Sequence, residues 1–336
     1  MEKIINRLNF AIFYRKSSTF WNIDSIISRF NIFSNKLNLH LIEISEYVDK
    51  PLPTSLHAVA MLPSDTDILP KLIYHNKDLF WVHSMFAGVE KFLALKEISE
   101  NKYIILTNSK GAFGESLAEF AIFSMLYFSY NSSAYVNAFK NKKWITPINK
   151  MINGKTLVIV GYGLNGSILA KKAKMGHNMK IIGIKKNIKD YQGREYVDEI
   201  CHIDDITNIL PGADFIVNFL PNTSETINFY DYEKFKLMKS SSVFINLGRG
   251  SSVKEEDLIK CLSNKLILGA SLDVFKTEPL SSDSPFYDLD NVLITCHSCD
   301  FTDEYFTQAV DVLCGNLNKY FNEGILTTYV DKKKGY

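Results

Sequence analysis

Short runs of apolar and β-branched residues recur along the whole chain, and amphipathic stretches separate them. The strand-like runs lie at 8–14, 39–44, 57–62, 79–82, 103–106, 156–160, 180–184, 213–220, 242–247, 266–272 and 292–295. Helix-like stretches lie between them, for example at 115–130, 167–174 and 255–263. Strands that alternate with helices predict right-handed βαβ units and therefore parallel sheets.

The later runs are more apolar than the earlier ones, as expected for strands that are covered on both faces. This difference predicts an α/β domain at the start of the chain and a doubly wound α/β domain in its middle and late parts. Pro147 and the stretch 149–155 resemble a connection, so we expect the second domain to begin there. A length of 336 residues is also typical of two domains.

Composition narrows the class of protein. The 38 Lys and Arg residues balance 37 Asp and Glu residues, which argues against a broadly basic surface for nucleic acid or an anionic membrane. The five cysteines are an odd number and all lie beyond residue 200, which indicates no disulfide framework and favours a reducing compartment. The chain has no run long enough to span a membrane, and its first residues lack the apolar core of a signal peptide. We therefore expect a cytoplasmic protein.

A glycine-rich segment follows the apolar run 156–160. Its sequence is Gly161-Tyr162-Gly163-Leu164-Asn165-Gly166, and a helical pattern and a second strand come after it. In this context Gly161 allows a tight turn, Gly163 lets the backbone approach a pyrophosphate, and Gly166 lets helix and strand pack closely. The helix N-terminus presents N–H groups to the phosphates. An ordinary glycine-containing turn is the alternative, but the strand–loop–helix context favours a dinucleotide site.

The end of the second strand bears on the choice of cofactor. NAD-binding folds place an acidic residue there against the ribose 2′-hydroxyl, whereas this chain has Lys185 and Lys186. Ammonium groups stabilise a 2′-phosphate that a carboxylate would repel, so the sequence favours NADP(H), with NAD(H) as the second cofactor. The alternative is that both lysines are simply a solvated strand end.

Three of the later apolar runs are each followed by a side chain that can carry a charge or transfer a proton, namely Arg249, Glu278 and His297. In an open parallel sheet ligands bind beyond the carboxyl ends of the strands, so these residues are expected to converge. The set suits hydride transfer to a 2-keto acid. Arg249 would bind the carboxylate and polarise the carbonyl, His297 would donate a proton, and Glu278 would raise the pKa of His297 and set its tautomer. Taken singly, each is more typical of an ordinary surface ion pair or a structural histidine.

Several colinear segments resemble one family, the D-isomer-specific 2-hydroxyacid dehydrogenases. The segments are 106–111, the glycine loop, 220–226, 245–250, 272–275 with 278–279, and 284–286. The segment 83–90 is similar to the substrate loop of the glyoxylate and hydroxypyruvate reductase branch, which prefers NADPH. The resemblance covers nearly the whole chain, and the series is far more specific than the glycine loop alone.

The resemblance implies an α/β fold of two Rossmann-like or flavodoxin-like domains. Residues 1–112 and 299–336 would form the substrate domain, and residues 113–298 the dinucleotide-binding domain. It implies that Arg249, Glu278 and His297 are catalytic, and that a small 2-keto or 2-hydroxy acid is the substrate. The implied cofactor-binding residues are Gly161, Gly163, Leu164, Asn165, Gly166, Lys185, Lys186, Pro221, Thr226, Leu247, Gly248 and Asp273. The implied substrate-binding residues are Phe86, Ala87, Gly88, Val89 and Arg249, and a homodimer is expected, with Trp144 near the partner's active site.

One segment departs from the family pattern. The catalytic histidine often follows a proline and precedes small residues, whereas here the sequence is Thr295-Cys296-His297-Ser298-Cys299-Asp300. The two cysteines could indicate a redox or metal pair, but no second pair of ligands accompanies them, so we expect no metal. A non-enzymatic dinucleotide sensor or corepressor-like module is the alternative function. A formate dehydrogenase is disfavoured because that branch pairs its histidine with glutamine.

Overall fold

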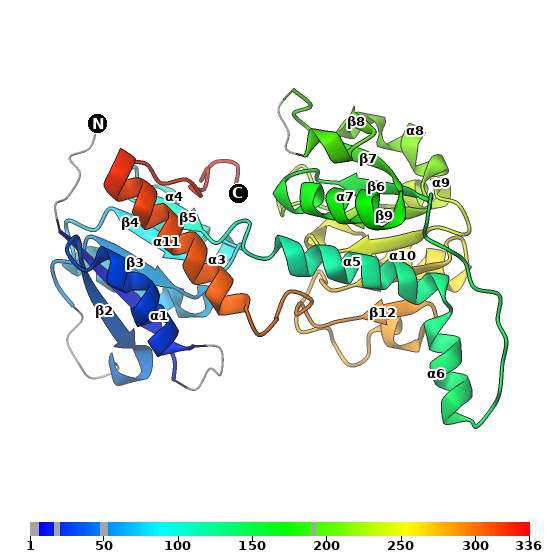
Figure 1. The fold of residues 1–336 in the computed structure, drawn as a ribbon, viewed down its shortest axis with the longest axis horizontal. Coiled ribbons are helices and arrows are strands. Elements are labelled where there is room, and N and C mark those ends of the chain that lie inside the picture. Colours follow the sequence, from blue (N-terminus) through cyan, green and yellow to red (C-terminus); the bar gives the residue numbers. More distant parts are fainter. Residues whose placement is uncertain (1–6, 17–20, 48–52, 190–192) are drawn as a thin grey trace. The chain divides into compact units, whose positions relative to one another are not determined.

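The computed structural model describes residues 7–16, 21–47, 53–189 and 193–336. The chain divides into two compact units, one made of the described residues up to Phe113 together with Thr302–Tyr336, the other of Gly114–Phe301 (Figure 1). Both units are α/β structures with entirely parallel sheets, which confirms the predicted fold class. The expected connection near Pro147 is wrong, because the second unit already begins at Gly114 with a helix that packs within it.

The first unit contains a five-stranded sheet in the order β2-β1-β3-β4-β5, which is the flavodoxin-like order. Its strands are β1 (Leu8–Tyr14), β2 (Leu37–Glu43), β3 (Ala58–Met61), β4 (Trp81–Ser84) and β5 (Ile105–Asn108). Its helices are α1 (Ile23–Phe30), α2 (Leu69–His75), α3 (Glu90–Leu93), α4 (Lys96–Ser99) and α11 (Tyr305–Glu323). Helices α1 and α11 lie side by side against one face of the sheet (Figure 1), and α2, α3 and α4 contribute to the apolar core on the other.

The C-terminal segment adds to the edge of this sheet beside β5. Tyr329 forms an antiparallel bridge with Thr107, and the Asn108 N–H donates to the Thr328 carbonyl at 3.1 Å. Asn316 of α11 is fully buried and accepts from the N–H of Thr327 at 2.8 Å. These bonds hold the end of β5 in place. Asn108 at this end also contacts the loop after β4, because its side chain donates to the Ala87 carbonyl.

The second unit contains a seven-stranded sheet in the order β12-β11-β10-β9-β6-β7-β8. Its strands are β6 (Thr156–Val160), β7 (Lys180–Lys185), β8 (Glu199–His202), β9 (Phe215–Asn218), β10 (Val243–Asn246), β11 (Gly269–Leu272) and β12 (Val292–Ile294). Its helices are α5 (Gly114–Ser129), α6 (Ser132–Lys140), α7 (Leu164–His177), α8 (Ile206–Ile209), α9 (Tyr232–Leu237) and α10 (Glu255–Ser263). The chain runs from β6 toward one edge and then from β9 toward the other. The strand order therefore reverses between β6 and β9, where open α/β sheets bind their ligands.

Burial agrees with the apolar character of the central strands. Every residue of β9, β10 and β11 is buried, because helices cover both faces of the sheet there. The edge strand β8 is half exposed, and its weak pattern gave no strand prediction. Among the described residues, no helix is both long enough and apolar enough to cross a bilayer.

Candidate active site

The glycine loop connects β6 to α7 at the point where the strand order reverses. Gly161 has a φ of +88°, and a Cβ there would lie 2.8 Å from the carbonyl carbon of Phe219. At Gly163 the nearest atom to a Cβ is 3.9 Å away, so the space above this residue is open. A Cβ on Gly166 would lie 3.1 Å from Ile159, where helix and strand pack closely. The three glycines therefore allow the turn, the open approach and the close packing that a dinucleotide loop needs.

Helix α7 begins at Leu164, directly after this loop. The N–H groups of its first turn, on Leu164, Asn165 and Gly166, have no acceptor within the helix. Together with the positive end of the helix dipole they make an anion-binding edge, so these residues fit a pyrophosphate. The adjacent loop after β9 is held by Thr226, whose hydroxyl donates to the Pro221 carbonyl at 2.6 Å.

The two lysines lie where the second strand of the unit ends. Lys185 is the last residue of β7, and its backbone pairs with His202 of β8. Lys186 forms an ion pair with Glu225 at 2.7 Å, and both side chains are about two-thirds exposed, at 66% and 67%. A phosphate at this edge would therefore meet a lysine that already has a carboxylate partner.

Arg249 follows β10 on a turn that buried polar groups hold in place. The Asn218 side chain donates to Asn246 Oδ1 and to Ser252 Oγ, both at 2.8 Å, and Ser252 in turn donates to the Arg249 carbonyl at 2.7 Å. A Cβ on Gly250 would lie 1.9 Å from the backbone of Phe275, so only glycine fits. This network could not be predicted from the sequence, because an asparagine inside an apolar strand carries no distinctive signal.

At Gly248, beside Leu247, the backbone also comes very close to another segment of the chain. A Cβ on Gly248 would lie 2.7 Å from the Leu220 carbonyl oxygen, and the Leu247 N–H donates to the Asn218 carbonyl at 3.1 Å. The turns after β9 and β10 are therefore in direct contact. Leu247 and Gly248 thus belong to the same strand-end surface as the glycine loop.

Glu278 and His297 form a hydrogen-bonded pair. His297 Nδ1 lies 2.7 Å from Glu278 Oε2, and Glu278 Oε1 accepts from the Phe275 N–H at 2.9 Å. The backbone of His297 has a φ of +51°, and its N–H donates to the Asp273 carbonyl at 2.7 Å. The pair therefore comes from the turns after the neighbouring strands β11 and β12, as expected for residues at one sheet edge.

Electrostatics in this pair favour the charged forms. The hydrogen bond that His297 donates to Glu278 raises the pKa of His297 above its usual value, although burial and the charge of Arg249 oppose this. Burial works to raise the pKa of Glu278, but the bonds from His297 and the Phe275 N–H outweigh it and lower that pKa. The arrangement is one in which an imidazolium is held ready to give up a proton from its other nitrogen.

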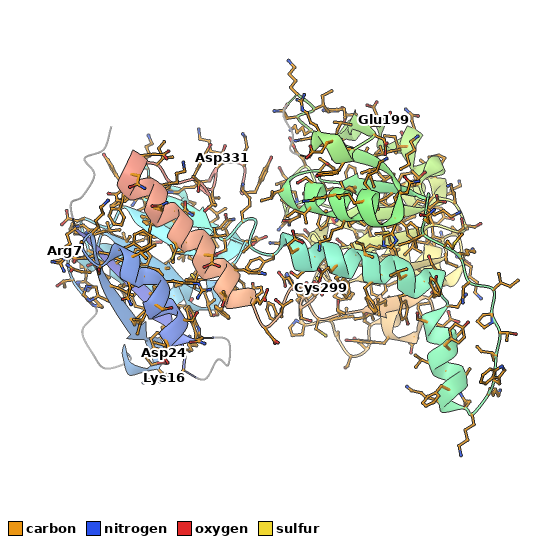
Figure 2. The ribbon with its side chains drawn as sticks, in the orientation of Figure 1. Arg7, Lys16, Asp24, Glu199, Cys299 and Asp331 are labelled. Atoms are coloured by element: carbon orange, nitrogen blue, oxygen red, sulfur yellow. The ribbon has the colours of Figure 1, made fainter. Side chains whose placement is uncertain are left out.

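Asp273 organises the loop that carries the histidine. Its carboxylate, which is buried, accepts from the Thr295 hydroxyl at 2.6 Å, the Ser298 N–H at 3.0 Å and the Cys299 N–H at 3.2 Å. The Cys299 thiol donates to the same carboxylate at 3.0 Å (Cys299 is labelled in Figure 2). Burial, then the charge of Asp273, raises the pKa of this thiol far above its usual range, so it stays protonated. Among the described residues, no group of three His, Cys, Asp or Glu is arranged to hold a metal.

Asp300 is a further acid at this edge that sequence analysis passed over. Burial raises its pKa to about 6, and the charge of Asp273 adds to this, while the charges of His297 and Arg249 act in the opposite direction. A carboxyl that titrates near neutral pH therefore lies within electrostatic reach of the predicted catalytic groups.

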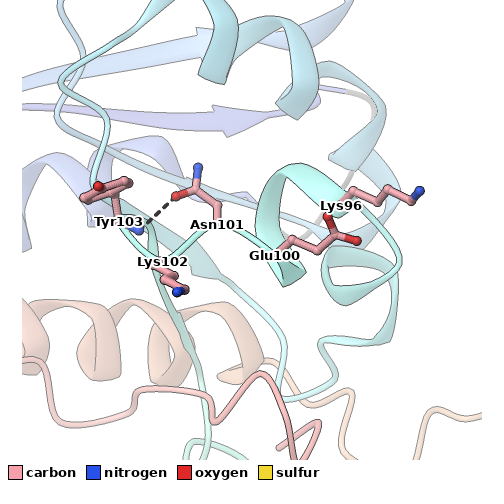
Figure 3. A pocket seen from close by; sticks show the side chains of 5 residues that line it. All are labelled: Lys96, Glu100, Asn101, Lys102 and Tyr103. Carbon is pink, nitrogen blue, oxygen red and sulfur yellow. Dashed lines mark hydrogen bonds between the residues drawn. The ribbon is translucent and has the colours of Figure 1, made fainter.

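The predicted substrate loop lies in the first unit. Phe86, Ala87, Gly88 and Val89 follow β4 and precede α3. The first unit also has a shallow surface hollow lined by Lys96, Glu100, Asn101, Lys102 and Tyr103 (Figure 3). Tyr103 is 83% exposed, and none of the predicted site residues lines this hollow.

The strand order and glycine loop define a dinucleotide-binding α/β protein, and comparison with known proteins specifies the family. The family model described as "D-isomer specific 2-hydroxyacid dehydrogenase, NAD binding domain" matches residues 122–299. The chain belongs to this family.

Relatives with assigned names match part of the chain. A probable 2-ketogluconate reductase of Dictyostelium discoideum is 31% identical over 205 residues, which is 60% of each chain. Glyoxylate/hydroxypyruvate reductase B of Escherichia coli is 40% identical over 154 residues, or 46% of each chain. The aligned segments thus span about half to three-fifths of these relatives.

Solved structures match nearly the whole chain in fold. An NADPH-dependent glyoxylate/hydroxypyruvate reductase from Sinorhizobium meliloti, solved with NADP and sulfate, superimposes with a TM-score of 0.80. It is 24% identical, and the match covers 98% of this chain and 100% of that one. A D-isomer specific 2-hydroxyacid dehydrogenase from Xanthobacter autotrophicus, solved with NADPH, gives a TM-score of 0.80 at 22% identity, over 97% and 99% of the two chains.

Proposed function

We propose that this protein reduces a small 2-keto acid of the glyoxylate or hydroxypyruvate type to the D-2-hydroxy acid, with NADPH as the preferred cofactor and NADH as the second. The observation that carries the proposal is the His297–Glu278 pair, with Arg249 near enough for its charge to act on both pKa values. Membership of the family and the names of the similar reductases support the choice of reaction.

Each of the three side chains has a defined part in this reaction. Arg249 binds the substrate carboxylate and polarises the keto oxygen through its guanidinium. A bound nicotinamide supplies the hydride that adds to the carbonyl carbon. His297 donates its Nε2 proton to the oxygen, which completes the hydroxyl group, and Glu278 stabilises the imidazolium before the transfer and holds Nδ1–H throughout.

The residues around the glycine loop fit the cofactor. The open space at Gly163 and the N–H groups of Leu164 and Asn165 suit the pyrophosphate. We assign Lys185 and Lys186 to the 2′-phosphate, which would compete with Glu225 for the ammonium group of Lys186. The remaining cofactor contacts that we propose are those of Gly161, Gly166, Pro221, Thr226, Leu247, Gly248 and Asp273.

We further propose that the second unit is the cofactor domain and the first unit is the substrate domain. The glycine loop and the catalytic pair both belong to the second unit. We propose that the segment from Phe86 to Val89 of the first unit binds the substrate carboxylate. The division that we propose is the one implied by the family resemblance, with residues 1–112 and 299–336 as the substrate domain and residues 113–298 as the cofactor domain.

A homodimer is the proposed assembly. Helix α6 and the segment after it extend away from the sheet of the second unit (Figure 1), and they carry several exposed large apolar side chains. Phe139 is 84% exposed, Trp144 95% and Ile148 91%. An apolar surface of this kind is typical of a protein–protein contact, and a second copy of the chain would cover it. The five free thiols support the expected cytoplasmic location.

A matrix of cofactors and substrates tests the function. Purified protein is mixed with NADPH or NADH and each of a set of 2-keto acids, and absorbance of the reduced nicotinamide is followed. We expect oxidation of NADPH with a small keto acid, and slower oxidation of NADH. If neither cofactor is oxidised with any of these acids, the reductase proposal fails and the dinucleotide-binding module takes its place.

A further inference from the structure

A buried polar network underlies the predicted substrate loop, and the reaction described above does not use it. Its members are Trp81, His83 and Ser84 of β4, Thr107 of β5 and Ser109 just after β5, and all five are fully buried. His83 lies opposite Thr107 in the parallel pairing of the two strands. A fully buried histidine needs a hydrogen-bond partner for each ring nitrogen. His83 has two such partners, the hydroxyl groups of Thr107 and Ser109.

The hydrogen bonds define which nitrogen of His83 carries the proton. The Trp81 indole N–H, which is a donor only, donates to Thr107 Oγ1 at 2.7 Å. His83 Nδ1 lies 2.7 Å from the same hydroxyl, which is therefore free to donate its own proton to Nδ1. At the other end the Ser109 hydroxyl donates to the Ser84 carbonyl at 3.2 Å and so accepts from His83 Nε2 at 3.3 Å. One chain of donors thus runs from Trp81 through His83 to the end of β4.

The same residues hold the carbonyl groups of the loop. Ser84 Oγ donates to the carbonyls of Phe86 and Gly88, at 3.0 and 3.2 Å, and the Ser109 N–H donates to that of Phe86 at 3.2 Å. The Asn108 side chain donates to the Ala87 carbonyl at 2.6 Å. Three successive carbonyls are therefore turned toward the protein. Within the part of the chain that the structure describes, the N–H groups of Ala87, Gly88 and Val89 have no acceptor.

We propose that His83, protonated on Nε2, is a positioning residue that acts through Ser109 to hold the N–H groups of Ala87, Gly88 and Val89 toward the substrate carboxylate. Successive backbone N–H groups form a concave anion site only when the carbonyls between them are held away. This role rests on the proposed function, since it concerns the same substrate loop. Burial lowers the pKa of His83 to about 3, so the network keeps one protonation state throughout the neutral range.

Ser109→Ala tests the link between His83 and the loop with a change too small to disturb the fold. Ser99→Ala is the matched control, because the Ser99 hydroxyl also donates to a backbone carbonyl of the first unit, at 3.0 Å, but on α4. We expect Ser109→Ala to raise the KM for the keto acid about 10-fold, since misplaced binding groups weaken catalysis by one to two orders of magnitude. The KM for NADPH is expected to stay unchanged, and so are both constants in Ser99→Ala. Equal effects of the two variants would overturn the proposal.

A second measurement needs no substrate. Two amides of the loop are hydrogen-bonded: the N–H of residue 109 donates to the Phe86 carbonyl, and the Phe86 N–H donates to Ser84 Oγ. Hydrogen exchange of these two amides is expected to be about 10-fold faster in Ser109→Ala than in the wild type or Ser99→Ala, because loss of the hydroxyl releases the loop. The ¹⁵N shifts of His83 in the wild type should show a proton on Nε2 from pH 5 to 8. Unchanged exchange, or a proton on Nδ1, would contradict the positioning role. Since this arm uses the ligand-free protein, it remains decisive even if the wild type reduces no keto acid.

Discussion

Glu278→Gln removes the charge from the proposed catalytic pair and keeps its shape. In the wild type Glu278 Oε2 lies 2.7 Å from His297 Nδ1, and this hydrogen bond raises the pKa of the histidine. An amide cannot stabilise the imidazolium in the same way, so the pKa of His297 should fall in the variant. Reduction needs the protonated imidazole, and the fall in kcat/KM with rising pH is therefore expected to begin at a lower pH.

The expected loss of activity in Glu278→Gln depends on how far the two side chains are exposed to solvent. The side chains of His297 and Glu278 are 47% and 35% exposed, so solvent screens their interaction in part. A hydrogen bond to a charged group contributes about 1.5–3 kcal/mol, whereas an exposed ion pair contributes at most about 1 kcal/mol. For this half-exposed pair about 1–2 kcal/mol is appropriate, which corresponds to an activity loss of about 5- to 30-fold.

A pH profile of kcat/KM measured from pH 5 to 9 provides the assay. The deficit of Glu278→Gln should be smallest at low pH, where His297 is protonated in both proteins, and largest above neutral pH. Glu255→Gln is the control, because Glu255 of α10 accepts at 2.7 Å from the N–H of Lys276, which lies in the same turn as Glu278, and among the described residues no hydrogen bond joins it to His297. If the profile of Glu278→Gln keeps the wild-type midpoint, the claim that Glu278 sets the pKa of the general acid is refuted.

Three further predictions concern other parts of the site. Since the pKa of Asp300 is raised to about 6, the KM for an anionic substrate should rise from pH 5 to 7 in the wild type and stay level in Asp300→Asn, as steady-state kinetics would show. Gly161→Ala should lower the free energy of unfolding by about 1–3 kcal/mol in thermal or urea unfolding, because its φ is positive and its Cβ would meet backbone, whereas Gly212→Ala, which has open space, should have little effect. Changing Lys185 to Asp and Lys186 to Ser should raise the KM for NADPH at least about 10-fold more than that for NADH, and equal changes would contradict the phosphate assignment.

Most of the fold could be predicted from the chain because periodicity and glycine placement are local signals. The runs 156–160 and 180–184 correspond to β6 and to nearly all of β7, and the glycine loop between them has the backbone that its sequence indicates. Edge elements were harder to predict. The half-exposed strand β8 has little apolar contrast, and α6 has an outward face that resembles a core face in the sequence. The connection expected near Pro147 was misplaced for a related reason, since nothing in the residues near Gly114 marks a boundary, and only the family resemblance gave a start at residue 113.

Residues that act through hydrogen bonds were the least predictable. Asn218, Ser252 and His83 lie in or beside apolar strands, and their importance depends on partners that are 24 to 34 residues away in the chain. Only the folded structure brings such partners together. Arg249, Glu278 and His297 were identifiable because each lies in the turn after a strand, three to six residues beyond its end, and in a parallel sheet such turns lie at a common edge.

The unusual sequence around His297 is compatible with a catalytic role because the backbone and Asp273 determine the shape of this loop. Two of the bonds that the Asp273 carboxylate accepts come from N–H groups, which any residue at 298 and 299 except proline would supply. Cys296 is exposed, so its side chain places no demand on the fold. The side chain of Cys299, in contrast to that of Cys296, does contribute to the fold. Its protonated thiol donates to the Asp273 carboxylate, and without this bond one buried oxygen of Asp273 would be less well satisfied. Cys299→Ser keeps a donor at this position and should retain activity, whereas Cys299→Val removes the donor and should lower activity by disturbing Asp273 and, through it, the histidine loop.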